Sequence, residues 1–174
     1  MSNVNGSYFD HDFFSIDTTR VLKGRKQALA DAYSRRLKAK HTLYCITGDE
    51  LVKSYKPFVP LLRTSIQQHG GSSKIVTNIE KGSIKAVNEL IEAGAEIRHI
   101  DKQMLRRCVV YDNSIAYFSI VEEPLITVKA IENVEETEGQ DLWISSAEVA
   151  VIKSARERFL SDWERAIPSV DSRL

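Results

Sequence analysis

The 174-residue chain has little of the residue types that mark secreted or membrane proteins. It holds two cysteines, Cys45 and Cys108, each within an apolar run, which disfavours a disulfide framework and favours a reducing cytoplasm. No apolar run approaches the ~18 residues that a membrane-spanning helix needs. The first 14 residues carry Asp10 and Asp12 in place of the basic and apolar segments of a signal peptide. We therefore expect a cytoplasmic protein without membrane insertion.

The sequence also lacks an excess of one charge, because 24 Lys and Arg residues balance 24 Asp and Glu residues. Without a net field, attraction to nucleic acid is not expected. Three basic clusters, at residues 20–26, 35–40 and 106–107, are typical of solvated helix faces, and a DNA-binding module remains the third-ranked alternative. With 43% hydrophobic residues, the composition is that of an ordinary globular domain.

Metal and cofactor motifs are missing as well. The histidines, His11, His41, His69 and His99, show no metal-ligand spacing. The Gly70-Gly71 pair precedes a predicted strand, whereas a phosphate-binding loop precedes a helix. Ser145-Ser146 lacks the flanking glycines of a nucleophile elbow. The sequence predicts no metal and no cofactor.

Hydrophobic periodicity predicts an α/β fold, a mixed β-sheet with helices on both faces. Helices are expected near 25–40, 50–68, 83–93 and 146–166, with a kink or a restart of the second near Pro57. Strands are expected at 42–47, 74–77, 95–100, 108–111, 115–120, 125–131 and 142–144, and the turn 112–114 predicts an antiparallel hairpin. Residues 1–17 are expected to be an irregular arm, 18–167 one domain and 168–174 a tail or linker.

The last helix carries the clearest local signals. Ser145 and Glu148 match a capping box, in which each side chain binds an unpaired amide of the first turn. Pro168 is expected to end the helix. Its predicted buried stripe consists of Val149, Ile152, Arg156 through its stem, Phe159, Trp163 and Ile167.

Polar residues follow the predicted parallel strands where each one ends. In open α/β sheets these ends line the place where small ligands bind. The same residue types also make caps and turns, so a purely structural role stays open. The candidates at these strand ends are Thr47, Asp49, Thr77, Asn78 and Asp101.

Residues 95–119 resemble the core of the phospholipase D-like fold, in which a strand carries a His-x-Lys-x4-Asp motif. Asp112 matches the motif's Asp, Arg107 stands at its Lys and Leu105 at its His, while Ser119 matches the small polar residue of the next strand. The family's reaction needs that histidine as the nucleophile on phosphorus, and leucine cannot replace it. The resemblance therefore implies a domain without catalysis. We add Arg107, Asp112 and Ser119 to the candidate ligand-binding residues.

A wider resemblance covers about residues 18–174. It is to the non-catalytic phospholipase D-like sensor regions of archaeal signalling proteins, found ahead of histidine-kinase modules, and more distantly to the effector domain of archaeal sugar-sensing transcription regulators. The segments that carry it are Thr19–Gly24, Glu96–Ile100, Tyr111-Asp112 and Trp163–Pro168. This resemblance implies a small-molecule ligand, a homodimer and an output kinase or regulator module.

The resulting interpretation is a sensory or regulatory domain that relays a state change through its last helix. A degenerate phosphodiesterase using His99, Asp101 and Lys102 is the enzymatic alternative, and the effector domain of a transcription regulator is another. Asp112 itself is expected to accept amides of its own turn, with Arg107 as a charge partner.

Overall fold

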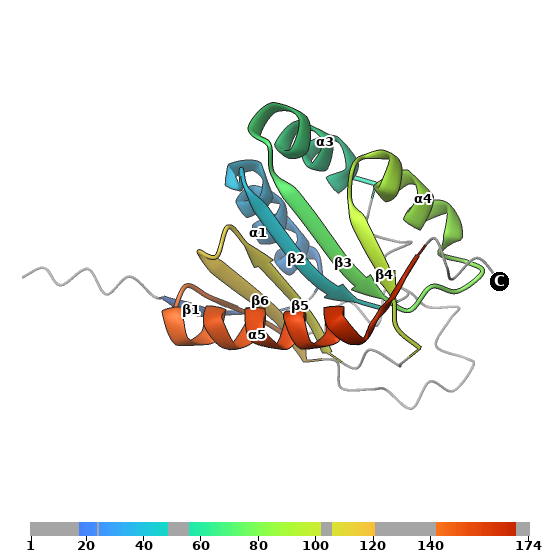
Figure 1. Cartoon of the computed structure of the whole chain (residues 1–174). Helices are drawn as coiled ribbons and strands as arrows, with labels where there is room; N and C mark the ends of the chain where they lie inside the picture. Colours follow the sequence, from blue (N-terminus) through green and yellow to red (C-terminus); the bar gives the residue numbers. More distant parts are fainter. Residues whose placement is uncertain (1–17, 24, 49–55, 102–105, 121–141, 170–174) are drawn as a thin grey trace, which may run out of the picture.

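The computed structural model describes residues 18–23, 25–48, 56–101, 106–120 and 142–169, which form one eight-stranded sheet with helices on both faces (Figure 1). The predicted mixed α/β architecture is confirmed. The strands are β1 Thr19–Lys23, β2 Thr42–Thr47, β3 Ser72–Thr77, β4 Glu96–His99, β5 Arg106–Tyr111, β6 Ile115–Ile120, β7 Leu142–Ser146 and β8 Ile167–Pro168. The helices are α1 Arg25–Lys38, α3 Phe58–His69, α4 Ile84–Glu92 and α5 Val149–Arg165.

The strand order is β1-β7-β6-β5-β2-β3-β4-β8. Only β2, β3 and β4 run parallel to one another, each joined to the next through a helix. The pairs β2–β5, β5–β6, β6–β7, β7–β1 and β4–β8 are antiparallel. The predicted hairpin is thus confirmed as β5–β6, and it places the antiparallel half of the sheet beside β2.

Side-chain alternation along the strands separates two cores. Ile46, Val76 and Val110 face α5, where they pack with Phe159. Ile75 and its neighbours on the other face pack against α3 and α4. On that same face, the β5–β6 hairpin packs against α1. Figure 1 shows α1, α3 and α4 on one side of the sheet and α5 alone on the other.

Aromatic stacking and two cations fix α5 on its face. The Phe159 ring stacks on Tyr44 at 4.9 Å and on Trp163 at 5.7 Å between ring centroids. Arg98 and Lys74 lie 4.4 and 5.3 Å from the Trp163 ring, distances at which a cation is attracted to the ring face. Arg98 also donates a 2.9 Å hydrogen bond to the Trp163 carbonyl. The end of α5 is thereby tied to β3 and β4.

Both ends of α5 differ from the sequence prediction. Ser145 is a strand residue paired with Arg20 and Tyr117, so it cannot cap, and the predicted capping box is wrong. Ser146 Oγ instead accepts a 3.2 Å hydrogen bond from the Glu148 amide. The Glu148 carboxylate accepts one from the Thr18 hydroxyl. Strand β7 continues to Ser146 because its partners β1 and β6 hold it there, which delays the helix.

The predicted apolar stripe is confirmed for Ile152, Phe159 and Trp163, which are buried, and wrong for Val149, Arg156 and Ile167, which are exposed. Val149, the first residue of α5, is 80% exposed, and the first buried residue of the helix is Ile152. Ile167 has left the helix and pairs with His99 in β8. Pro168, the residue expected to stop the helix, lies in this edge strand, where a missing amide is tolerated.

The remaining predictions concern the other secondary-structure elements and the two ends of the chain, and the described residues test only some of them. Strand β1 was not predicted, and α3 begins at Phe58 after Pro57. The earlier part of the expected helix, at 50–55, lies outside the described residues, as do the expected strand 125–131, the arm 1–17 and residues 170–174. Gly94, which follows α4, has a positive φ of 100°. No helix within the described ranges is long and apolar enough to cross a membrane.

The connection from α3 to β3 depends on a glycine. A Cβ added at Gly71 would stand 2.7 Å from the Lys40 carbonyl oxygen and from Ser65 Oγ, and 2.9 Å from the His41 carbonyl oxygen. Two of these atoms belong to the backbone that leads from α1 into β2, so they cannot move away cheaply. A Cβ at Gly82 would meet nothing within 4 Å.

We therefore expect Gly71→Ala to lower the free energy of unfolding by about 2 kcal/mol or more through overpacking. Gly82→Ala, the matched control, should stay within about 0.5 kcal/mol of the parent or stabilise it slightly. Urea denaturation of the three proteins measures this. Equal midpoints for the two variants would show that the close approach at Gly71 is not a constraint.

Candidate functional site

A row of side chains crosses six strands at the end of the sheet where the parallel strands finish. Thr47 pairs with Thr77, and Thr77 with His99. Across the hairpin, Arg107 pairs with Ser119, and Ser119 with Trp143. Because Ile46 pairs with Cys108, the same register places Thr47 beside Arg107. We call this set the polar row; its members are Trp143, Ser119, Arg107, Thr47, Thr77 and His99.

All members of the polar row face the side of the sheet that carries α1, α3 and α4. Side chains two residues apart on a strand share a face. Ile75 and Ile97, two residues before Thr77 and His99, pack against α3 and α4. Tyr117, two residues before Ser119, packs in the cluster beneath α1, which Trp143 joins as well. The predicted strand-end site is therefore longer than the sequence indicated, because three antiparallel strands add to it.

The structure gathers some predicted site residues and separates others. Thr47, Thr77, Arg107 and Ser119 belong to the polar row, and Asn78 follows Thr77, with its amide donating to Glu80 at 3.1 Å. Asp112 lies five residues beyond Arg107 along β5, which is about 16 Å, at the opposite end of the sheet. Asp49 falls outside the described residues.

Two donors at one end of the polar row are buried without a hydrogen-bond partner among the described residues. They are Ser119 Oγ, on a side chain 2% exposed, and the indole Nε1 of Trp143. The Arg107 guanidinium lies 5.9 Å from the Trp143 ring centroid. Sequence reasoning missed Trp143, because 21 residues outside the described ranges, 121–141, separate β6 from β7 and hide the register.

His99 holds the other end of the polar row. Its Nδ1 accepts a 2.9 Å hydrogen bond from the Ile79 amide, which fixes the ring and leaves the proton of the neutral ring on Nε2. Three strand spacings separate His99 from Arg107, about 14 Å, so the two cannot hold one phosphoryl group. Asp101 is exposed, whereas Lys102 and Leu105 lie outside the described residues.

The two cysteines do not supply a nucleophile. Burial is the main cause that raises the pKa of Cys45 to about 12 and the pKa of Cys108 to about 12. Both thiols are therefore protonated at neutral pH, and a protonated thiol is a poor nucleophile. Cys45 faces α3 and α4, whereas Cys108 faces α5. No three His, Cys, Asp or Glu side chains of the described residues converge as metal ligands would.

Asp112 forms hydrogen bonds with residues that are far from it in the sequence. Its carboxylate accepts hydrogen bonds from three successive amides, those of Lys40 at 2.8 Å, His41 at 2.8 Å and Thr42 at 2.7 Å. The prediction that Asp112 binds amides of its own turn is therefore wrong, since the amides lie about 70 residues earlier. Arg107 is not its charge partner, because the two occupy opposite ends of β5.

The hairpin turn aims the Asp112 side chain at those amides. Asp112 and Asn113 have φ values of 49° and 51°, a left-handed conformation that Asp and Asn tolerate better than most residues. Burial alone would raise the pKa of the Asp112 carboxyl. The hydrogen bonds from Thr42, Lys40 and His41 outweigh burial and hold that pKa below its usual value.

We expect Asp112→Asn to lower the free energy of unfolding by about 1–2 kcal/mol at pH 7, because charge-assisted hydrogen bonds are lost while the turn conformation is kept. A lowered carboxyl pKa stabilises the fold above the unfolded-state value near 3.9, and this contribution disappears as the pH falls through the folded-state value. The difference from the parent should therefore shrink below about pH 4.

Denaturation of the parent and variant across pH 3–7 tests this prediction. Asp101→Asn, which alters an exposed aspartate at the other end of the sheet, is the matched control and should change little at any pH. A parent-to-variant difference independent of pH would contradict the assigned role of the Asp112 charge.

Comparison with known proteins identifies the fold. No family model matches the sequence, and no curated protein does either. Among solved structures, the chain is similar to Nuc of Salmonella typhimurium, a phospholipase D family member, with a TM-score of 0.65, 14% identity and coverage of 86% of this chain and 96% of Nuc. NucT of Helicobacter pylori gives a TM-score of 0.64, 10% identity and coverage of 86% and 98%.

A third similar structure is TrmBL2, described as an archaeal chromatin protein with a novel mode of DNA binding. Its TM-score is 0.63 at 15% identity, over 89% of this chain. The chain spans only 55% of TrmBL2. Sequence identities of 10–15% establish that the fold is shared, but they do not establish a shared activity. The chain has a phospholipase D-like fold, as the motif resemblance implied.

Proposed function

We propose that the chain is a non-catalytic regulatory domain that binds a small ligand at the polar row and relays the binding through α5. The observation that carries the proposal is the pair of buried donors at Ser119 Oγ and Trp143 Nε1 that have no hydrogen-bond partner among the described residues. Leaving such a group unpaired costs about 1–3 kcal/mol. Buried polar groups are otherwise paired with protein, water or ligand, so a ligand that accepts both hydrogen bonds accounts for them.

The side chains restrict the chemistry of this ligand. An indole N–H and a guanidinium can only donate, and a serine hydroxyl can also donate. A ligand touching Trp143, Ser119 and Arg107 must therefore offer acceptor oxygens. The Arg107 charge favours an anionic oxygen, as in a carboxylate or a phosphate ester. The two neutral donors also suit sugar hydroxyls.

The absence of catalysis rests on the motif. Leu105 stands where the phospholipase D-type reaction needs its nucleophile, and His99 is about 14 Å from Arg107. The enzymatic alternative, a degenerate phosphodiesterase using His99, Asp101 and Lys102, is supported by likeness to Nuc and NucT over most of their lengths.

Nucleic-acid binding is the remaining alternative. The similarity to TrmBL2, which is described as DNA-binding, supports nucleic-acid binding. It disagrees with our expectation that the chain has no nucleic-acid partner. The zero net charge of the chain argues against nucleic-acid binding. Retention on duplex DNA that weakens steeply with salt is the behaviour it requires.

The way in which α5 is held supports the proposed relay through this helix. Trp163 is clamped by Arg98 of β4 and Lys74 of β3, the strands whose ends carry His99 and Thr77 of the polar row. A displacement of these strands would therefore reach the end of α5. The homodimer, the histidine-kinase or regulator output module and the cytoplasmic location stay predictions.

A thermal-shift screen of phosphate esters, carboxylates and sugars tests the ligand. A compound at 100 times its dissociation constant stabilises by about 2.7 kcal/mol, which raises the melting temperature by roughly 5–10 °C. Ser119→Ala should abolish the shift while leaving the unliganded melting temperature unchanged or higher. Ser73→Ala is the matched control, since it removes another buried hydroxyl without a partner among the described residues, at the far end of β3. A shift kept by Ser119→Ala would contradict the site.

The parent should show no turnover of bis(p-nitrophenyl) phosphate, because the nucleophile position holds leucine. His99→Ala is the discriminating variant. Turnover above background that His99→Ala removes would establish the enzymatic alternative and exclude the regulatory one.

A further inference from the structure

A pocket of about 270 Å³ lies at the end of the sheet opposite to the polar row. The end of α1, the turn of the β5–β6 hairpin, the start of β1 and the end of β7 enclose it. It shares no residue with the polar row. Its lining residues are Thr18, Arg20, Arg35, Lys38, Ala39, Tyr111, Asp112, Ser114, Ile115, Ser145 and Ala147.

Cations dominate the wall of this pocket. Arg20, Arg35 and Lys38 face a single lining acid, Asp112. That carboxylate is already bound by three backbone amides, which satisfy much of its hydrogen-bonding capacity. The pocket therefore presents donors to its interior and few acceptors.

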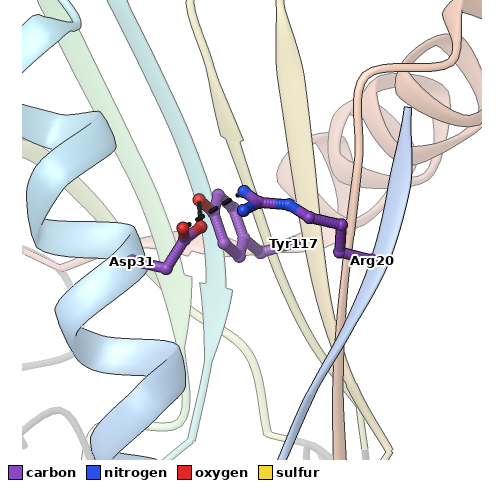
Figure 2. A network of polar contacts seen from close by, with 3 residues as sticks. All are labelled: Arg20, Asp31 and Tyr117. Atoms are coloured by element: carbon purple, nitrogen blue, oxygen red, sulfur yellow. Dashed lines mark hydrogen bonds and ion pairs between the residues drawn. The ribbon is translucent and has the colours of Figure 1, made fainter. Parts of the chain in front are cut away.

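A polar network fixes one of these cations (Figure 2). Arg20 Nη2 donates to Asp31 Oδ1 at 3.1 Å, and the Tyr117 hydroxyl donates to the other Asp31 oxygen. The network joins β1, α1 and β6, and it neutralises Arg20. Within the described residues, Arg35 and Lys38 have no carboxylate within ion-pair distance, so their charges remain for a ligand.

A fourth cation stands behind the wall. Arg36 is only 3% exposed, and its Nη1 has no hydrogen-bond partner among the described residues. Burial lowers the pKa of Arg36, while Tyr111 and Asp112 of the pocket wall act in the opposite direction. Burial likewise raises the pKa of Tyr111, so this phenol stays neutral and cancels none of the positive charge.

The acids of the neighbourhood offset this charge only in part. Asp31 is bound by Arg20 and Tyr117, Asp112 by backbone amides, and Glu148 by the Thr18 hydroxyl. The four cations, Arg20, Arg35, Arg36 and Lys38, outnumber these three acids, so the surroundings of the pocket remain positively charged and suit an anionic ligand. Arginine forks and a lysine ammonium bind phosphate oxygens particularly well.

We propose that this pocket is a second binding site, for a small molecule that carries a phosphate or diphosphate group. Its volume of about 270 Å³ is large enough for a diphosphate group. The site is independent of the ligand proposed for the polar row. Because the pocket includes Thr18 and Ser145 at the junction of β1 and β7, occupancy would brace the strand that leads into α5.

Isothermal titration of the protein with inorganic pyrophosphate tests the site. Arg35→Gln and Lys38→Gln should each weaken binding roughly tenfold, as loss of one charge-assisted contact predicts. Lys85→Gln, which removes an exposed charge from α4, is the matched control and should bind as the parent does. Ser119→Ala should also bind as the parent does, which separates this site from the polar row.

Several results would overturn the proposal. They are the absence of pyrophosphate binding, equal affinity in the parent and both pocket variants, and equal binding of sulfate at matched ionic strength, which would indicate an adventitious ion only. Binding of duplex DNA that Arg35→Gln and Lys38→Gln weaken, without pyrophosphate binding, would replace the small ligand by nucleic acid. Unchanged melting temperatures of the variants would attribute any loss to the site and not to folding.

Discussion

The bond between the Asp112 carboxylate and the amides of residues 40–42 is the contact on which the sheet depends. It attaches the turn of the β5–β6 hairpin to the chain entering β2, and so sets β5 antiparallel beside the first of three parallel strands. The same connection accepts hydrogen bonds from β3 and α3, at 2.6 Å from the Ser72 amide to His41 and at 3.0 Å from Ser65 Oγ to Lys40. Gly71 allows this close approach.

This constraint gives the two ends of the sheet different chemistry. At the Asp112 end, the carboxylate is bound by three backbone amides, and the pocket beside α1 is lined by three cations. At the other end, the parallel strands finish together and the register of β5, β6 and β7 continues their line. Ser119 Oγ and Trp143 Nε1 lie there without a hydrogen-bond partner among the described residues, and the two proposed ligand sites are about 16 Å apart along β5.

The motif resemblance combines two separable roles. Asp112 acts through hydrogen bonds to the backbone, which any protein with this hairpin can use whether or not it is an enzyme. The nucleophile position, where the resemblance puts Leu105, lies outside the described residues. In the proposed function, Arg107 and Ser119 keep the polar character of the site and serve binding alone.

The sequence by itself determined the mixed α/β class, the four helices and the β5–β6 hairpin, because hydrophobic period and turn residues are local signals. Only the tertiary structure decided the partners of Asp112, the end of β7 at Ser146, the place of Trp143 in the polar row and the cationic pocket. Each of these joins residues far apart in the chain: Asp112 meets residues about 70 positions earlier, and Thr18 meets Glu148. Local sequence patterns do not predict such contacts. The free energy that stabilises them comes from packing and hydrogen bonding between strands, and the order of those strands in the sheet cannot be derived from local patterns.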